Sequence, residues 1–275
     1  MEAEKKVVKF QLIAETQKIQ VKPFLIWVGG KTKVLPFLLN NIPADYKAYH
    51  EPFVGGGALF FNLQPKKAYL SDANKDLINT YVQVRDNVEE VISRVSFHIS
   101  KSDKHYYNNM VKRFNKAYLS GLDKASIFIY LNKAGFRGLL RYNSEGHINT
   151  TFGNKLSFNA DNMRKTSKLL GNVKLRNQSV FDIVPQKGHF YYLDPPYAGD
   201  VEKPYSYNFT QDDQISLANL CHTINRVGGK FMLSNSKNDF TLEAYKKYKV
   251  EEITLNNELS ATPGSKRTEI LVRNY

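Results

Sequence analysis

The chain has 275 residues, of which 42% are hydrophobic and 24% charged, so it can bury a large core and is neither a mini-protein nor a disordered tail. Its 39 Lys and Arg against 26 Asp and Glu give a formal net charge of +13, and residues 101–176 alone hold 15 basic and 4 acidic residues. A basic region of this size predicts a polyanionic partner, nucleic acid first and an anionic membrane surface second.

The remaining composition argues against several chemistries. Cys221 is the single cysteine, so neither a disulfide framework nor a cysteine-rich zinc site is expected, and its helical surroundings favour a core residue over a nucleophile. The six histidines show no H-x-E or H-E-x-x-H spacing, which predicts no metal. Residues 1–22 lack the apolar core of a signal peptide, and no stretch could span a membrane. We therefore expect an intracellular, cytoplasmic protein that is neither secreted nor membrane-bound.

The first third of the chain alternates strands and helices. Residues 1–22 are expected to form a charged N-terminal arm. The hydrophobic pattern then predicts, in chain order, a helix over residues 29–42, a strand over 49–54, a helix over 58–63, a strand over 68–71 and a helix over 75–95. The three glycines at 55–57 join the first strand to its helix, which is the order of a βαβ unit.

The middle of the chain differs in character. Two helices are expected over residues 106–119 and 123–134, the second with Asp123 as its N-cap and Gly135 just past its end. The polar stretch 135–161 mixes glycines with aromatic and basic side chains, and a loop of this length is typically functional or disordered. After Gly171 the pattern predicts strands over 173–175, 189–193, 230–234, 250–255 and 268–272, with helices over 212–227 and 240–248. This organisation indicates an α/β fold split by a mostly helical insert over residues 75–165.

A glycine turn and two carboxylates in the first βαβ unit point to a nucleoside-containing cofactor. Gly55 and its neighbours would let the backbone approach a ligand, and Glu51 or Asp72 could accept hydrogen bonds from ribose hydroxyls or an adenine amine. The segment does not match the G-x-G-x-x-G pattern, and a glycine turn is also compatible with a purely structural role. This motif alone therefore leaves both interpretations open.

The sequence Asp194-Pro195-Pro196-Tyr197 follows a short apolar strand and is more informative. Asp194 would lie at the carboxyl end of that strand, where open α/β sheets bind ligands. Neither proline can donate a backbone hydrogen bond, so the Asp194 carboxylate and the Pro195 carbonyl form adjacent acceptors suited to an amino group. With Tyr197 as a stacking face, the motif suits an adenine or cytosine flipped out of a duplex. A proline-rich turn without function is the alternative.

Taken together, these and other segments resemble the serial motifs of Dam-type, class alpha DNA adenine-N6 methyltransferases. In chain order they are residues 24–31 (FLIWVGGK), 50–57 (HEPFVGGG), 70–74 (LSDAN), 130–133 (YLNK) with 138–143 (GLLRYN), 194–197 (DPPY) and 233–235 (LSN). The resemblance runs from residue 22 to residue 275, and several independent motifs in the family's order make a chance match negligible.

The resemblance implies an α/β fold with a Rossmann-like methyltransferase sheet, formed by residues 23–74 and 166–275, and a target-recognition insert over residues 75–165. It implies an adenine-specific, site-specific DNA methyltransferase that transfers a methyl group from S-adenosyl-L-methionine to adenine N6 in double-stranded DNA by base flipping. The implied catalytic residues are Asp194, Pro195, Pro196 and Tyr197, and the implied cofactor-binding residues are Trp27, Lys31, Phe53, Gly55, Asp72 and Asp194. No metal and no obligate protein partner is expected.

Specificity for the DNA sequence would come from the insert. By resemblance to relatives that methylate GATC, which is the expected site, the DNA contacts would be Phe136, Arg137, Leu139, Arg141, Asn143 and Thr151. Three positions depart from those relatives: Ile26 replaces a lysine that touches guanine, Arg137 an asparagine and Thr151 a proline. Arg137 could contact guanine itself or bind phosphate. An RNA adenine-N6 methyltransferase and a catalytically silent DNA-binding protein are the alternatives.

Overall fold

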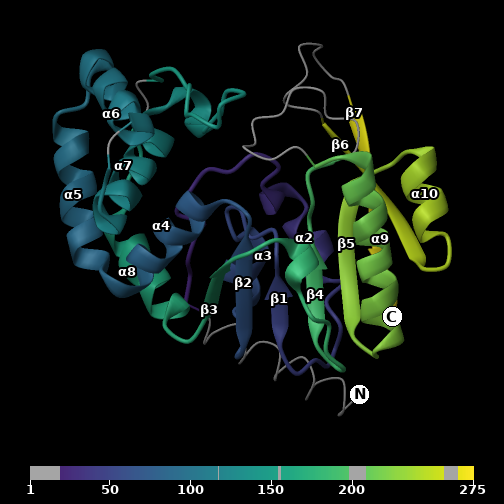
Figure 1. The fold of residues 1–275 in the computed structure, drawn as a ribbon. Helices are drawn as coiled ribbons and strands as arrows, with labels where there is room; N and C mark the ends of the chain where they lie inside the picture. The colour runs from purple at the N-terminus through teal and green to yellow at the C-terminus, as the bar shows by residue number, and fades with distance from the viewer. Residues whose placement is uncertain (1–18, 117, 154–155, 198–208, 257–265) are drawn as a thin grey trace.

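The computed structural model describes residues 19–116, 118–153, 156–197, 209–256 and 266–275, so most of the expected N-terminal arm lies outside the described residues. Within them, seven strands form one sheet in the order β3-β2-β1-β4-β5-β7-β6 (Figure 1). The strands are β1 (Tyr49–Glu51), β2 (Ala68–Asp72), β3 (Lys174–Asn177), β4 (Phe190–Leu193), β5 (Lys230–Ser236), β6 (Lys249–Asn256) and β7 (Lys266–Arg273). The first five run parallel, whereas β7 is antiparallel to both β5 and β6. The expected α/β fold is confirmed.

The helices fall into two groups (Figure 1). Those that accompany the sheet are η1 (Lys31–Lys33), α2 (Leu35–Leu39), α3 (Ala58–Leu63), η3 (Val180–Asp182), α9 (Gln211–Arg226) and α10 (Asp239–Tyr245). Those gathered beyond the β3 edge are α4 (Lys75–Asp86), α5 (Val88–Ser100), α6 (Lys104–Lys116), α7 (Gly121–Ala134), η2 (Phe136–Gly138) and α8 (Ala160–Leu170). No helix among the described residues has the length and apolar character needed to cross a membrane.

The strand β4 is buried on both faces. All four of its residues are inaccessible, as a continuous apolar run predicts for a parallel strand covered by helices on each side. Phe190 and Tyr192 pack into the core that includes α3 and α4, whereas Tyr191 and Leu193 pack into the core that includes α9. Asp194, the next residue, is therefore anchored by a strand that two cores hold in place.

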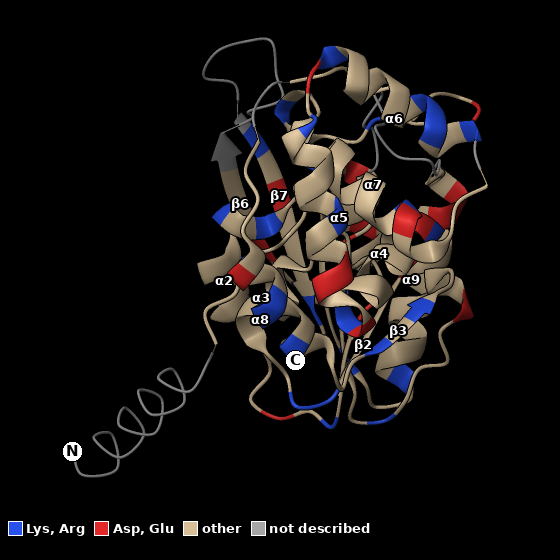
Figure 2. Cartoon of the chain, turned by 90° about the vertical axis from the view of Figure 1, so that its left-hand side faces the viewer, with Lys and Arg blue, Asp and Glu red and all other residues tan. Residues whose placement is uncertain are grey.

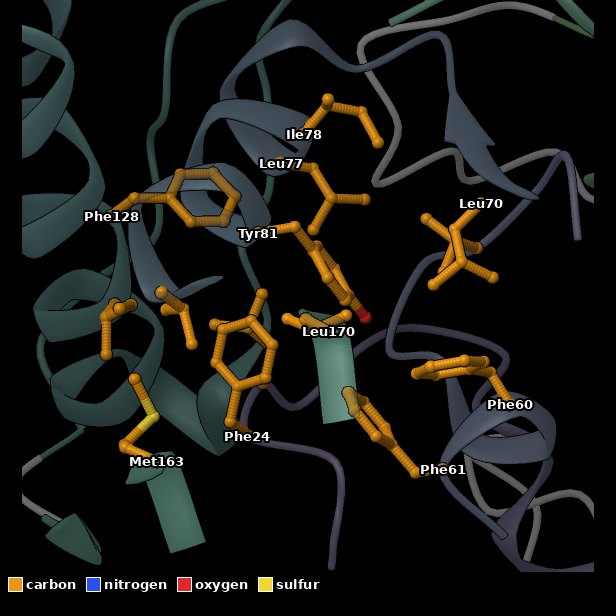
Figure 3. Close-up of a cluster of buried hydrophobic side chains, with 14 of the residues drawn as sticks. Phe24, Phe60, Phe61, Leu70, Leu77, Ile78, Tyr81, Phe128, Met163 and Leu170 are labelled. Atoms are coloured by element: carbon orange, nitrogen blue, oxygen red, sulfur yellow. The ribbon is translucent and has the colours of Figure 1, made fainter. Parts of the chain in front are cut away.

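The larger core joins the sheet to the helical insert without a break (Figure 3). Leu70 of β2, Tyr81 of α4, Phe128 of α7 and Leu170 of α8 all belong to it. Phe24 belongs to it as well, with its ring centre 5.0 Å from that of Tyr81. Full burial of a large apolar side chain contributes roughly 1.5–3 kcal/mol, so contacts of this kind bind the insert firmly to the sheet.

Several expected helix limits are wrong, among them the ends expected at residues 119 and 248, since α6 ends at Lys116 and α10 at Tyr245. Three other differences have a local cause. The helix expected over residues 75–95 is two helices, α4 and α5, separated at Asn87, whose φ of −135° lies outside the helical region. The N-cap of α7 is Ser120 rather than Asp123, because the Ser120 hydroxyl accepts the backbone N–H of Asp123. The helix expected over residues 29–42 is reduced to η1 and the short α2, with Pro36 in the first turn of α2.

The polar stretch 135–161 has more structure than a plain loop. Gly135 pairs with Phe152, and Tyr142 pairs with Ile148, as isolated antiparallel bridges, so the chain doubles back on itself. The helix α8, which the hydrophobic pattern did not predict, begins at Ala160 and spans the expected domain boundary between residues 165 and 166.

Candidate active site

A cavity of about 270 Å³ lies at the carboxyl ends of β1, β2 and β4. The residues that the sequence predicts as catalytic or cofactor-binding all border it: Trp27, Lys31, Phe53, Gly55, Asp72, Asp194, Pro195, Pro196 and Tyr197. They come from four separate segments of the chain. Three of the segments lie at the carboxyl ends of β1, β2 and β4, and they meet because parallel strands end on the same edge of the sheet. The segment of Trp27 and Lys31 follows no described strand and is placed by the packing of Trp27 on Gly55 and by the ion pair of Lys31 with Asp194.

The glycine loop after β1 is held against Trp27. Gly55 has a φ of 45°, and a Cβ at this position would lie 2.6 Å from Cδ1 of Trp27, so a larger residue would displace the indole. The Asp72 carboxylate accepts hydrogen bonds from the backbone N–H groups of Gly55, at 3.2 Å, and Asn74, at 3.0 Å. The Tyr81 hydroxyl donates to the Gly55 carbonyl at 3.0 Å. Asp72 therefore fixes the shape of the glycine loop, and both Asp72 and this loop border the cavity.

Asp194 and Lys31 form a largely buried ion pair. Lys31 Nζ lies 2.8 Å from Oδ1 of Asp194, with 7% and 17% of the two side chains exposed. Burial raises the pKa of Asp194, and the ammonium group of Lys31 opposes that rise. Lys31 Nζ also donates to the Gly29 carbonyl at 3.1 Å and lies 4.8 Å from the ring centre of Tyr197. Lys31 thus favours the charged, hydrogen-bond-accepting form of Asp194.

Side chains for which the sequence predicted no role hold the Pro-Pro-Tyr turn. The Gln214 amide donates to the Pro196 carbonyl at 2.9 Å, and its own oxygen accepts a 2.9 Å hydrogen bond from Asn235 Nδ2. The Tyr197 hydroxyl donates to Oε2 of Glu269 at 2.9 Å. No short-range pattern could reveal these contacts, because the first pair is 18 residues apart in the chain and the last 72.

Three carboxyl groups that border the cavity have raised pKa values. Burial raises the pKa of Glu51 to about 8 and that of Asp72 to about 6, and it also raises the pKa of Asp194. The Tyr49 hydroxyl, which donates to Oε2 of Glu51 at 2.8 Å, limits the rise at that residue. A cationic ligand would favour the ionised form of all three groups. Among the described residues, no three His, Cys, Asp or Glu side chains are grouped so that they could hold a metal ion.

One wall of the cavity was not predicted. Ser179, Val180 and Phe181, which follow β3, border the cavity. The Phe209 ring lies 6.1 Å from that of Phe181 and 5.8 Å from that of Phe53, measured between ring centres. The signal for this wall lies in the topology, because β3 pairs in parallel with β2 and ends on the same edge of the sheet.

The residues expected to contact DNA lie on the loop formed by residues 135–153. They are Phe136, Arg137, Leu139, Arg141, Asn143 and Thr151. All of them are exposed except Leu139, which is half-buried. None of these six borders the cavity, but the intervening residues Leu140 and Tyr142 do. The loop therefore turns one set of side chains outward while another set closes the cavity.

Hydrogen bonds within this loop give it a defined shape. The buried Thr150 hydroxyl donates to the Leu139 carbonyl at 2.8 Å and accepts the backbone N–H of Arg141 at 2.7 Å. The Asn143 side-chain oxygen accepts two backbone N–H groups at the tip of the loop, at 3.1 and 2.9 Å. Thr150 was not singled out from the sequence, since a lone threonine carries no pattern that would indicate this role.

Comparison with known proteins identifies the family. The family model described as "D12 class N6 adenine-specific DNA methyltransferase" matches residues 27–259. The chain belongs to this family.

Relatives of this D12 methyltransferase align with nearly all of its length. It is 33% identical to the type II methyltransferase M1.LlaDCHI of Lactococcus lactis subsp. cremoris, over 96% of this chain and 99% of that protein. It is 34% identical to the type II methyltransferase M.MjaIII of Methanocaldococcus jannaschii, over 94% and 100%. It is 31% identical to the retron Ec67 DNA adenine methylase of Escherichia coli, over 90% and 89%. The family that the sequence motifs predicted is confirmed.

Proposed function

We propose that this D12 methyltransferase transfers a methyl group from S-adenosyl-L-methionine to N6 of adenine in double-stranded DNA. The observation that carries the proposal is the cavity that brings Asp194 and Pro195 together with the carboxylates of Glu51 and Asp72. The first pair offers two adjacent acceptors for an amino group, and the second pair offers negative charge to a cationic donor.

The residues around the cavity fit this methyl donor. S-adenosyl-L-methionine carries a positive ammonium group and a positive sulfur, which suit carboxyl groups such as Glu51. The rings of Trp27, Phe53 and Phe181 offer apolar surface for its adenine. We assign donor binding to Trp27, Lys31, Phe53, Gly55, Asp72 and Asp194. When bound, the donor supplies an electrophilic methyl group on its sulfur.

The chain's own contribution to the reaction is alignment. The amino group of adenine is a poor nucleophile because its lone pair is delocalised into the ring. Hydrogen bonds from N6–H to the Asp194 carboxylate and the Pro195 carbonyl would draw the nitrogen toward tetrahedral geometry and localise that lone pair. Lys31 would keep Asp194 in the accepting form, and the Tyr197 ring, held through its hydroxyl, would stack on the base. Alignment of this kind requires no covalent intermediate.

The target adenine would have to leave the duplex to reach the largely buried Asp194. Phe136, which is 52% exposed on the adjacent loop, is proposed to occupy the space that the flipped base leaves. Arg137 and Arg141 are proposed to read base edges in the major groove. GATC is the proposed methylation site.

The phosphate backbone is proposed to lie along α6. This helix contains no acidic residue, and four of its side chains are basic and exposed: Lys104, Lys112, Arg113 and Lys116. Figure 2 marks the Lys and Arg positions of the chain in blue. Contacts between these side chains and phosphates would be independent of base sequence and would weaken with added salt. They would position the duplex while the loop of residues 135–153 selects the site.

Expression in a host that lacks adenine methylation, followed by sequencing that detects N6-methyladenine, tests the proposal. We expect methylation at one short sequence, GATC. Asp194→Asn preserves the shape of the side chain but removes its charge, and it should lower methyl transfer roughly 10²–10³-fold while DNA binding persists. Transfer by the purified protein to RNA but not to duplex DNA, or DNA binding without any transfer, would refute the proposal.

A further inference from the structure

The side chain of Asn132 in α7 hydrogen-bonds two segments that lie far apart in the chain. Its Oδ1 accepts the backbone N–H of Ile26 at 3.0 Å, and its Nδ2 donates to the Ile26 carbonyl at 2.8 Å and to the Gly138 carbonyl at 2.7 Å. An asparagine amide has two N–H donors, so both are used here. Asn132 is 0% exposed, and one buried side chain therefore fixes Ile26 relative to Gly138.

The two segments also touch directly. Gly138 has a φ of 70°, and a Cβ at this position would lie 2.4 Å from Cδ1 of Ile26. Gly138 ends η2, which we call the recognition turn and which includes Phe136 and Arg137. Arg137 itself has a φ of 57°, a conformation uncommon for a residue other than glycine. The recognition turn thus packs against Ile26 with two of its residues, Arg137 and Gly138, at positive φ.

Ile26 begins the stretch of residues 26–31, which borders the cavity and which we call the donor segment. The donor segment continues from Ile26 to Trp27 and ends at Lys31, which forms the ion pair with Asp194. If the donor segment shifts away from the recognition turn, the Asn132 amide has to give up either its two hydrogen bonds to Ile26 or its buried hydrogen bond to Gly138, and unpaired polar groups away from water are costly. The two elements are therefore expected to move as one unit.

We propose that Asn132 is a positioning residue that couples binding of the methyl donor to discrimination among DNA sequences. A donor that orders the donor segment would, through Asn132, also order the recognition turn, and a site read by that turn would be distinguished more sharply. The inference rests on the proposed function, since it takes the cavity as the donor site and the recognition turn as a reader of bases.

A second asparagine supplies a matched control. Asn162 of α8 accepts the backbone N–H of Lys22 and donates to the Lys22 carbonyl, both at 2.9 Å. Asn162 thus makes to the Lys22 backbone the same pair of hydrogen bonds that Asn132 makes to the Ile26 backbone. Lys22 precedes the donor segment, however, and Asn162 makes no contact with Gly138. Asn132→Asp and Asn162→Asp both keep the Oδ1 acceptor and replace the N–H donors by a second acceptor oxygen. They make the same substitution at a fully buried position and at a partly exposed one.

The experiment measures fluorescence anisotropy of two labelled duplexes, with and without S-adenosylhomocysteine as the donor analogue. One duplex carries the sequence found to be methylated in the sequencing experiment, and the other carries it scrambled. For the natural protein, the analogue should raise the ratio of the two affinities by a coupling factor of at least about 5. Asn132→Asp should bring this factor close to 1, whereas Asn162→Asp should leave it unchanged.

A purely structural role for Asn132 would weaken binding to both duplexes equally and leave the coupling factor unchanged, and that result would overturn the inference. If Asn132→Asp does not fold, Asn132→Ala decides, because alanine removes the amide without placing a carboxylate at this buried position. Asn132→Ala should then lower the factor, and a natural value in this variant, or a factor near 1 in the natural protein, would overturn the inference. A natural protein that binds neither analogue nor duplex would refute the proposed function itself.

Discussion

Replacement of Gly55 by alanine is expected to destabilise the protein and to weaken donor binding. Gly55 has a φ of 45°, and an alanine held in this left-handed region costs roughly 1–2 kcal/mol. The added methyl group would also lie 2.6 Å from Cδ1 and 2.9 Å from Nε1 of Trp27. Trp27 packs on Phe128 and would have to shift, which adds roughly 1–3 kcal/mol of overpacking. The expected total loss of unfolding free energy is therefore about 2–5 kcal/mol.

The variant Gly146→Ala separates the two contributions. Gly146 has a φ of 75°, but no described atom lies within 4 Å of a Cβ placed there. Its substitution should cost only the backbone term of roughly 1–2 kcal/mol. Urea unfolding of both variants measures the difference, and calorimetric titration with S-adenosylhomocysteine measures donor affinity, which only Gly55→Ala should lower. If the two variants lose the same unfolding free energy, or if Gly55→Ala binds the donor analogue as tightly as the natural protein, the packing of Trp27 on the glycine loop is not the cause of the expected losses.

Donor affinity is expected to increase as the pH rises from about 6 to about 8, because the Glu51 carboxyl, whose pKa burial raises to about 8, has to lose its proton to oppose a cation. Calorimetry in two buffers of different ionisation enthalpy should detect proton release that Glu51→Gln removes, and proton uptake would contradict the assignment. Without donor, the unfolding free energy should fall between about pH 7 and about pH 8, since folded Glu51 then retains a proton that the unfolded chain has lost; a flat urea-midpoint profile would argue against this. Replacing Lys112 and Arg113 by alanine should weaken binding to every duplex alike and reduce the slope of log K against log salt by roughly 1.8, whereas an unchanged slope would exclude phosphate contacts there.

The placement of the segment Asp194-Pro195-Pro196-Tyr197 was predictable because its signal is local. The apolar run of β4 predicts a strand covered on both faces, and the prolines after Asp194 predict that the chain leaves the sheet there. The same reasoning applies to Asp72, which ends β2. Since parallel strands end on one edge, local signals were enough to predict that these two side chains border one cavity.

Features that depend on distant partners were not predictable in this way. Asn132 lies in the motif of residues 130–133 and follows an apolar run, but its partner Ile26 is 106 positions away and no local pattern identifies it. Ser120 and Asp123 are both good N-cap residue types, so only the hydrogen bond between them decides where α7 begins. The helix α8 escaped prediction because Thr166, the middle one of its three buried positions at helical spacing, is polar, which leaves Met163 and Leu170 as apolar positions seven residues apart.

The continuity of the core across the sheet and the insert limits how this chain can be re-engineered. Because Leu70, Tyr81 and Phe128 share one core, the insert cannot be exchanged as a cassette unless the recipient supplies matching surfaces on α4 and α7. The loop of residues 135–153 is different, because it contributes only two buried apolar side chains to that core, Leu140 and Ile148. Variation concentrated in this loop can alter the outward-facing side chains while the core is kept. Under the proposed function, this loop is therefore the place where a new sequence preference can be built without redesigning the fold.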